Sequence, residues 1–359
     1  MKRTLRLHFI AAVLVAGLFW WKPVTSSSAN NRDHCLTIGM PSTTGKSGKE
    51  FSDIWKRILA DRDHIDLIGI PKSKDNDEQE DELGYCVYSS KSCGAELWGG
   101  VKFPGNIGHF RPHYKGKSKV KVCLLSVEEW RLDGVDRGFE GVLSVSWNHD
   151  SEAAKNFFAD KSNYEKTETG KDKVIFERLA LINDEGITGG GHGFLIPNKA
   201  NGSFQTFEFH CPNYACLPKD IEIPLTMTIQ LTAFAESELE TFYSVKDYLD
   251  SEKYHKVDEY GNQYASKCFC SGSFINDLPN YKRDEFAIIV GHVVEVEEKT
   301  NEITGKSFYW ALLRTAEDVE IDVVMDKELL QNCEAGPPRV GGVVRGHFWL
   351  SGQVVDCAV

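Results

Sequence analysis

The sequence predicts a β-rich α+β fold in two parts. An irregular α+β domain is expected over residues 30–275, and a small closed β-barrel is expected over residues 284–357. Short runs of β-branched and aromatic residues, separated by glycine and polar turns, indicate strands throughout. Two features predict the barrel. A glycine inside its first apolar run lets that strand bend, and a short connector at 327–332 precedes its last apolar run. Its runs lie at 286–296, 306–313, 319–325 and 342–354.

The first domain combines short strands with few helices. Apolar residues at helical spacing predict a helix over 51–59, with Ser47 and Glu50 as a capping box in front of it. Further helices are expected at 151–158, where Asp150 caps, and at 244–254. The remaining apolar runs predict strands at 35–38, 64–70, 85–89, 120–127, 139–147, 174–182, 204–209 and 221–235. The charged stretch 72–84 is expected to be a solvated loop.

Residues 1–29 have the layout of a secretory signal. A positive start precedes an uncharged apolar run, 7–21, and small residues end at Ala29, where cleavage is plausible. The run is short for a membrane span, which needs about 20 apolar residues. Aromatic residues before Lys22 nevertheless suit an interfacial anchor, so membrane attachment through residues 7–21 is the alternative. Either way, the rest of the chain is expected to be exported, periplasmic or extracellular.

Composition is that of an ordinary globular protein with an acidic surface. Apolar residues make up 41%, and the net charge is −12. Residues 284–357 alone contain 14 acidic and 6 basic residues. Such a surface repels phosphate backbones, which argues against nucleic acid as a partner.

The last third of the chain carries a resemblance. The phrases at 231–235, 307–310 and 348–352 resemble an uncharacterised group of bacterial proteins, and residues 284–355 look like a five-stranded OB-type barrel. The resemblance implies architecture and no established chemistry, so no functional residue is transferred from it. The OB-fold by itself suggests oligonucleotide or glycan binding, but a fold does not determine a function.

Ten cysteines in an exported chain predict disulfides, with 86/93 and 211/216 as close pairs and the connectivity left open. The alternative is a zinc-stabilised module in which four thiolates bind the metal. Cys-x-Cys spacing is poor for structural zinc, so disulfides are favoured and no cofactor is expected. The four candidate ligands are Cys211, Cys216, Cys268 and Cys270.

Two further motifs have weak support. Residues 39–47 approach a phosphate loop between a strand and a helix, but Met40 occupies the position of the first required glycine. The basic island from His109 to Lys121 has alternating lysines, which suit one exposed face of a strand. A turn with a capping box explains the first motif, and a solvated cationic face explains the second.

Catalytic candidates are few. His192 lies in a glycine-rich loop, and His149 with Asp150 offers an acid–base partner. No serine lies in a G-x-S-x-G elbow, and no cysteine has a protease context. These residues support, as the alternative function, an extracytoplasmic hydrolase with a His/Asp site.

The favoured functional hypothesis depends on aromatic residues of the expected barrel. Trp310, Trp349 and Phe348 could form a platform for sugar rings or peptide, although adjacent strand residues face opposite sides and core filling is the competing explanation. The sequence thus favours a non-catalytic binding or interaction protein of the cell envelope, with an unknown protein, peptide or glycan as partner.

Overall fold

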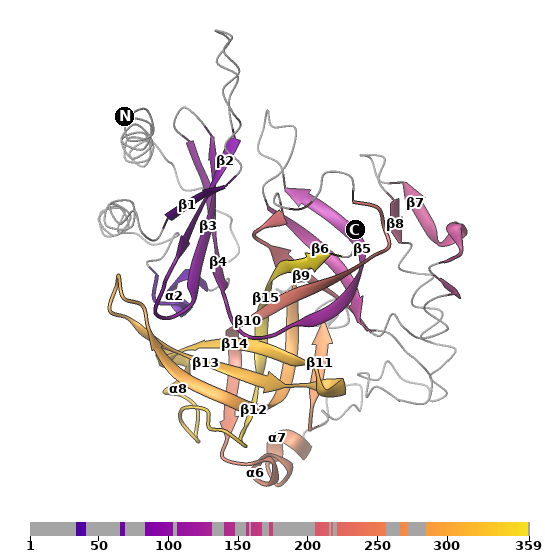
Figure 1. The fold of residues 1–359 in the computed structure, drawn as a ribbon. Helices are drawn as coiled ribbons and strands as arrows, with labels where there is room; N and C mark the ends of the chain where they lie inside the picture. The colour runs from indigo at the N-terminus through magenta and orange to yellow at the C-terminus, as the bar shows by residue number, and fades with distance from the viewer. Residues whose placement is uncertain are drawn as a thin grey trace, which may run out of the picture.

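The fold is known from a computed structural model. It describes residues 34–40, 65–68, 83–102, 106–130, 140–147, 156–157, 159–166, 172–174, 205–214, 217, 221–255, 266–271 and 285–357. Within these ranges the protein is β-rich with few, short helices, as predicted (Figure 1). None of the helices in these ranges combines the length and apolar character needed to cross a bilayer.

A small antiparallel sheet holds four strands in chain order. Two of them, at 65–68 and 83–89, confirm strands that the sequence predicted. In Figure 1 this sheet stands beside the larger one, above its orange strands. The four strands are β1 (Ile65–Ile68), β2 (Leu83–Ser89), β3 (Ala95–Lys102) and β4 (Asn106–Tyr114).

Nine strands form a large mixed sheet in the order β11-β12-β13-β14-β10-β15-β9-β6-β5. All the runs predicted between 286 and 354 are strands in it. The nine strands of this sheet are β5 (Val120–Trp130), β6 (Glu140–Trp147), β9 (Gln205–Cys211), β10 (Leu225–Phe242), β11 (Cys268–Ser271), β12 (Phe286–Thr300), β13 (Ser307–Arg314), β14 (Glu320–Asp326) and β15 (Val343–Cys357).

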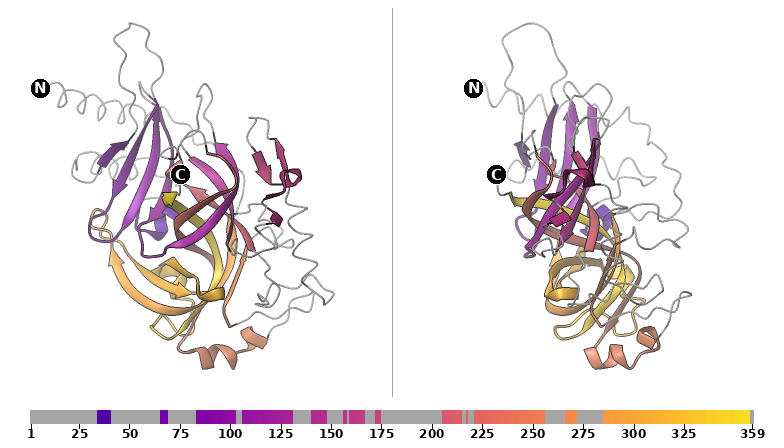
Figure 2. Two further views of the ribbon diagram at one scale, coloured as in Figure 1. Left: turned by 45° about the vertical axis from the view of Figure 1, so that its right-hand side comes forward. Right: turned by 90° about the vertical axis from the view of Figure 1, so that its right-hand side faces the viewer.

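The large sheet closes on itself in two rings that share the β10–β15 pair. The first ring runs β12-β13-β14-β10-β15 and returns to β12. The second runs β10-β15-β9-β6-β5 and returns to β10. One edge of β10 stays on β15 throughout, while the other edge leaves β5 at Ile229 and pairs with β14 from Thr232. The two views of Figure 2 show the strands of the second ring continuing away from the orange and yellow strands of the first.

The first ring crosses the expected domain boundary. Four of its strands come from 286–357, but β10 comes from 225–242, inside the expected N-terminal domain. The parallel β10–β14 contact and the long antiparallel β10–β15 contact bind it into the ring. A division of the chain between 275 and 284 therefore does not separate this ring from the upstream residues.

Helices lie outside the sheets. The predicted strand at 35–38 is wrong: residues His34–Thr37 form helix α2. Cys35 of this helix and Ile38, which follows it, pack on the first ring instead of pairing with a strand. The helical run 244–254 is confirmed as α6 (Val245–Leu249) and α7 (Glu252–His255), and α8 (Lys327–Leu330) occupies the connector. The short elements are η1 (Lys161–Asn163), η4 (Ala316–Asp318), β7 (Tyr164–Lys166) and β8 (Asp172–Val174). The predicted helix at 51–59 lies outside the described residues.

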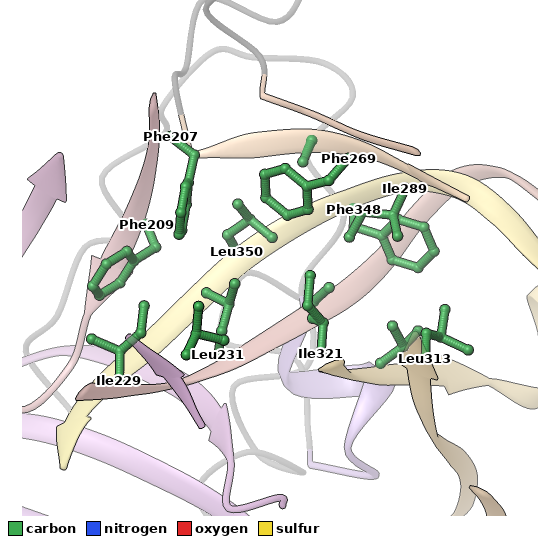
Figure 3. Close-up of a cluster of buried hydrophobic side chains, with 14 of the residues drawn as sticks. Phe207, Phe209, Ile229, Leu231, Phe269, Ile289, Leu313, Ile321, Phe348 and Leu350 are labelled. Atoms are coloured by element: carbon green, nitrogen blue, oxygen red, sulfur yellow. The ribbon is translucent and has the colours of Figure 1, made fainter. Parts of the chain in front are cut away.

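One continuous apolar core fills both rings. Phe207 and Phe209 of β9 meet Ile229 and Leu231 of β10, and Phe348 continues the cluster toward β12 (Figure 3). Residues at alternate positions of each strand point inward, as the two-residue period of a strand requires. The outward residues of the first ring form a second cluster with α2 and the small sheet, which includes Phe308, Trp310, Val324, Trp349, Leu97 and Tyr114.

Candidate functional site

A hollow of about 470 Å³ opens at the α8 end of the first ring. Its volume falls within the range of small-ligand sites. Leu330 and Ala335 are buried and form an apolar floor. The other lining residues are Tyr243, Tyr309, Lys327, Gln331, Cys333, Glu334, Gly336, Pro337 and Arg339.

Two tyrosines line the hollow, and a cation covers each. The Arg339 guanidinium lies 4.3 Å from the centre of the Tyr243 ring, and the Lys327 ammonium lies 6.0 Å from the centre of the Tyr309 ring. Both distances permit a cation–π attraction. Tyr243 is 50% exposed and is one of three large apolar side chains that stand exposed among the described residues. Another of the three is Val340, which follows Arg339 directly.

The two cations differ in their acidic partners. Lys327 forms an ion pair with Glu298, whose carboxylate also accepts the Tyr309 hydroxyl at 3.0 Å. The hydrogen bonds from Lys327 and Tyr309 lower the pKa of Glu298, so the carboxylate stays ionised. Arg339 has no carboxylate within 4 Å among the residues that the structure describes. The hollow thus holds one neutralised cation and one without an acidic partner.

Backbone contacts hold the loop that carries Arg339. The Gly342 amide donates to the Arg339 carbonyl at 2.9 Å, and Val293 exchanges two hydrogen bonds with Gly341 and Gly342. At the other end of the loop the Thr241 hydroxyl donates to the Gly336 carbonyl at 2.7 Å. The guanidinium is therefore presented from a fixed backbone.

Cys333 lies in the hollow wall but is poorly suited to nucleophilic chemistry. Its thiol donates to the Leu239 carbonyl at 3.2 Å. Burial raises the pKa of the thiol, and the thiolate is the reactive form. The residue packs as part of the core that fills the first ring.

The aromatic platform expected from the sequence is covered by the chain itself. Trp310, Trp349 and Phe348 are all buried, at 1%, 5% and 0% exposed. Phe348 points into the core, and Trp310 stacks against Tyr114 of the small sheet. Trp349 stacks on His34 of α2 at 4.8 Å between ring centres. Both members of the adjacent pair 348/349 are therefore buried, because elements cover both faces of β15.

The structure describes only some of the residues considered for catalysis or zinc binding. His192, His149, Asp150 and Cys216 lie outside the described residues. Cys211, Cys268 and Cys270 are buried, and burial raises the pKa of Cys268 to about 12. Among the described residues no group of three or more His, Cys, Asp or Glu is placed to hold a metal ion.

Seven cysteines have described side chains, and all seven are buried thiols. Two of them, Cys93 and Cys211, belonged to the close pairs considered for disulfides. Their sequence partners, Cys86 and Cys216, have no described side chain. Disulfide formation in the exported protein therefore stays a prediction.

The structure describes part of the phosphate-loop motif and part of the basic island. The phosphate-loop interpretation requires a strand before the loop, but α2 precedes it, and the Gly39 carbonyl accepts the Thr304 hydroxyl at 2.6 Å. Residues 41–50 lie outside the described part. Lys115, Lys117, Lys119 and Lys121 are exposed in alternation, as expected, although β5 begins only at Val120. His113 of the same island is fully buried.

Sequence inspection missed the hollow. Tyr243 lies far from Lys327 and Arg339 in the chain and meets them only because the first ring closes. One signal was present: an arginine after two prolines, Pro337 and Pro338, in a loop between strands marks a rigid exposed cation. Comparison with protein-family models, curated proteins and solved structures finds no match to this chain.

Proposed function

We propose that this chain is an exported, non-catalytic binding protein of the cell envelope, and that its partner is a peptide segment held in the hollow beside α8. The observation that carries the proposal is the combination of an apolar floor, the exposed ring of Tyr243 and the unneutralised Arg339 in one concave site. Apolar lining with a few fixed polar groups is typical of ligand sites. A peptide partner is favoured over a glycan because a cation already covers one face of each tyrosine ring.

The arrangement of strands in the first ring also supports the hollow as the binding site. We propose that the first ring is an OB-like barrel in which β12, β13, β14 and β15 supply four strands in chain order and β10 supplies the fifth from upstream. OB-folds commonly bind ligands on the face of their second and third strands. Here the corresponding outer face of β13 and β14 packs against α2 and the small sheet. A partner must therefore bind elsewhere, and the hollow at the barrel end is open.

A peptide array tests the binding function. The full exported chain is incubated with short peptides, and bound peptides are ranked by Kd. We expect Tyr243→Ala to weaken the bound set at least tenfold, and Val355→Ala to leave it unchanged. Val355 is the matched control because it is 56% exposed and lies in the last residues of β15, outside the hollow. Peptides recovered at their original mass support a non-catalytic role, and cleaved peptides contradict it.

Intact mass tests the proposed export. Protein taken from the exported fraction should have lost residues 1–29 if the signal is cleaved. Each disulfide lowers the mass by about two units relative to the reduced chain, because two thiol hydrogens are lost. A full-length mass in a membrane fraction supports the anchored alternative, and a full-length mass in the cytoplasmic fraction contradicts export.

A further inference from the structure

The hollow carries an inference about the chemistry of its ligand. Its two cations are held differently: Lys327 is neutralised by Glu298, whereas the described residues place no carboxylate within 4 Å of Arg339. Other arginines in the same ring are neutralised, since Arg314 pairs with Glu320 and Arg345 pairs with Glu240, both at 2.7 Å. Arg339 thus stands apart from the arginines around it.

The setting of Arg339 suits recognition of an anion. The centre of its guanidinium lies 4.3 Å from the centre of the Tyr243 ring. The guanidinium is planar and carries a rigid fork of N–H donors. That fork matches the two oxygens of a carboxylate. The hydrogen bonds that fix the loop at Arg339 and Gly336 reduce the entropy lost when a ligand binds.

The apolar floor lies within the same hollow. Leu330 and Ala335 are buried beneath it, and Pro337 is exposed at its side. The Glu334 carboxylate also lines the hollow and disfavours a ligand with several negative charges. A ligand with one carboxylate next to an apolar side chain satisfies all of these groups.

We propose that Arg339 binds a single carboxylate of the ligand, and that the favoured ligand is the C-terminus of a peptide ending in an apolar residue. This inference rests on the proposed binding function. The terminal carboxylate would accept two N–H bonds from the guanidinium, and the last side chain would lie on the floor formed by Leu330 and Ala335. A glutamate side chain within a peptide offers the same chemistry from a second source.

The test uses fluorescein-labelled tetrapeptides ending in Leu, Val or Phe, made with a free carboxylate and with a carboxamide. Anisotropy titrations of the full exported chain should show at least tenfold tighter binding of the free acids. Arg339→Gln should bring acid and amide to the same Kd, and Arg339→Lys should keep part of the preference. Arg314→Gln is the matched control, because it removes an exposed arginine outside the hollow and should change neither Kd.

The outcomes separate the two proposals. Equal binding of acid and amide, lost together in Tyr243→Ala, overturns the carboxylate inference and leaves the binding function intact. Absence of binding by either form at millimolar concentration overturns both. Amidated peptides with an internal glutamate that bind as tightly as the free acids, and depend on Arg339, support the carboxylate and assign it to a side chain.

Discussion

The imidazole Nε2 of His113 lies 2.5 Å from the Oε1 atom of Gln230, inside the molecule and fully shielded from solvent. Gln230 donates through its Nε2 atom to Asp322 at 2.7 Å, which directs its carbonyl oxygen toward the histidine. His113 must therefore carry its proton on Nε2 and accept the Ser351 hydroxyl on Nδ1 at 2.9 Å. This chain of contacts joins the small sheet to β10, β14 and β15.

We expect His113 to make the protein less stable in mild acid. Burial lowers the pKa of His113 below its usual 6.5, so the folded state resists a proton that the unfolded state accepts. Stability is complete above pH 6.5 and falls as the pH drops toward the folded pKa, by at most about 1.4 kcal/mol per pH unit. Urea unfolding between pH 5 and pH 8 should show a shallower dependence in His113→Gln. His255→Gln is the control, because this histidine is exposed at the end of α7 and should leave the pH dependence unchanged. An unchanged slope in His113→Gln contradicts the assignment.

Asp322 should be the most sensitive polar residue of the core. Its carboxylate accepts the Trp310 indole at 2.8 Å, the Gln230 amide, and the backbone amides of Lys117 and Ser118. Asp322→Asn places an NH2 group against donors and leaves at least one buried N–H without an acceptor, which should cost about 2–4 kcal/mol in the free energy of unfolding. Glu295→Gln, which removes the exposed partner of Lys117, should cost less than about 1 kcal/mol in the same urea titration. Similar costs for the two variants would contradict a network centred on Asp322.

The strands could be predicted from sequence because their signal is local. Alternating or continuous β-branched and aromatic runs predicted every strand from 286 onward. The closure of the ring could not be predicted, because β10 reaches β14 through pairing between residues about 90 positions apart. The helix α2 was predicted as a strand because a short apolar run such as Cys35–Ile38 is compatible with a helix or a strand. Burial against the first ring decides between helix and strand.

The candidate site was harder to predict for the same reason. The sequence identified the aromatic residues of 286–354, but whether Trp310 and Trp349 are exposed depends on the small sheet and α2 covering that face. Tyr243 and Arg339, which stay exposed, come from loops that carry no periodic signal. Burial of an aromatic residue is a property of the assembled fold and not of its own strand.

Gly352 should tolerate no side chain. A Cβ atom there would lie 2.5 Å from the Phe209 ring, which belongs to the core that both rings share. Gly352→Ala should therefore destabilise the protein by about 1–3 kcal/mol through overpacking. Phe209→Leu in the same chain should recover part of that loss, and a double-mutant cycle from urea unfolding measures the coupling. Additive effects of the two substitutions would contradict the contact.

Glu302 should hold the small sheet on the first ring through hydrogen bonds. It lies in the turn between β12 and β13, and its carboxylate accepts the Ser90 and Ser92 hydroxyls at 2.5 and 2.6 Å and the Lys91 amide at 3.0 Å. Partial burial opposes ionisation, but these hydrogen bonds prevail and lower the pKa of Glu302 to about 2. The carboxylate therefore stays charged across the neutral range and holds the β2–β3 turn against the ring.

Glu302→Gln should release that turn without unfolding the core. We expect a loss of about 1 kcal/mol near neutral pH, because solvent screens the site, together with faster hydrogen exchange of the 90–95 amides. The stability that Glu302 contributes is present above pH 4.5, its usual pKa, and is lost as the pH falls toward 2, so the difference between wild type and variant should shrink over that window. Glu165→Gln, an exposed carboxylate on β7, is the control and should change neither exchange nor stability. Unchanged exchange at 90–95 in Glu302→Gln would contradict a role for Glu302 in holding this turn on the ring.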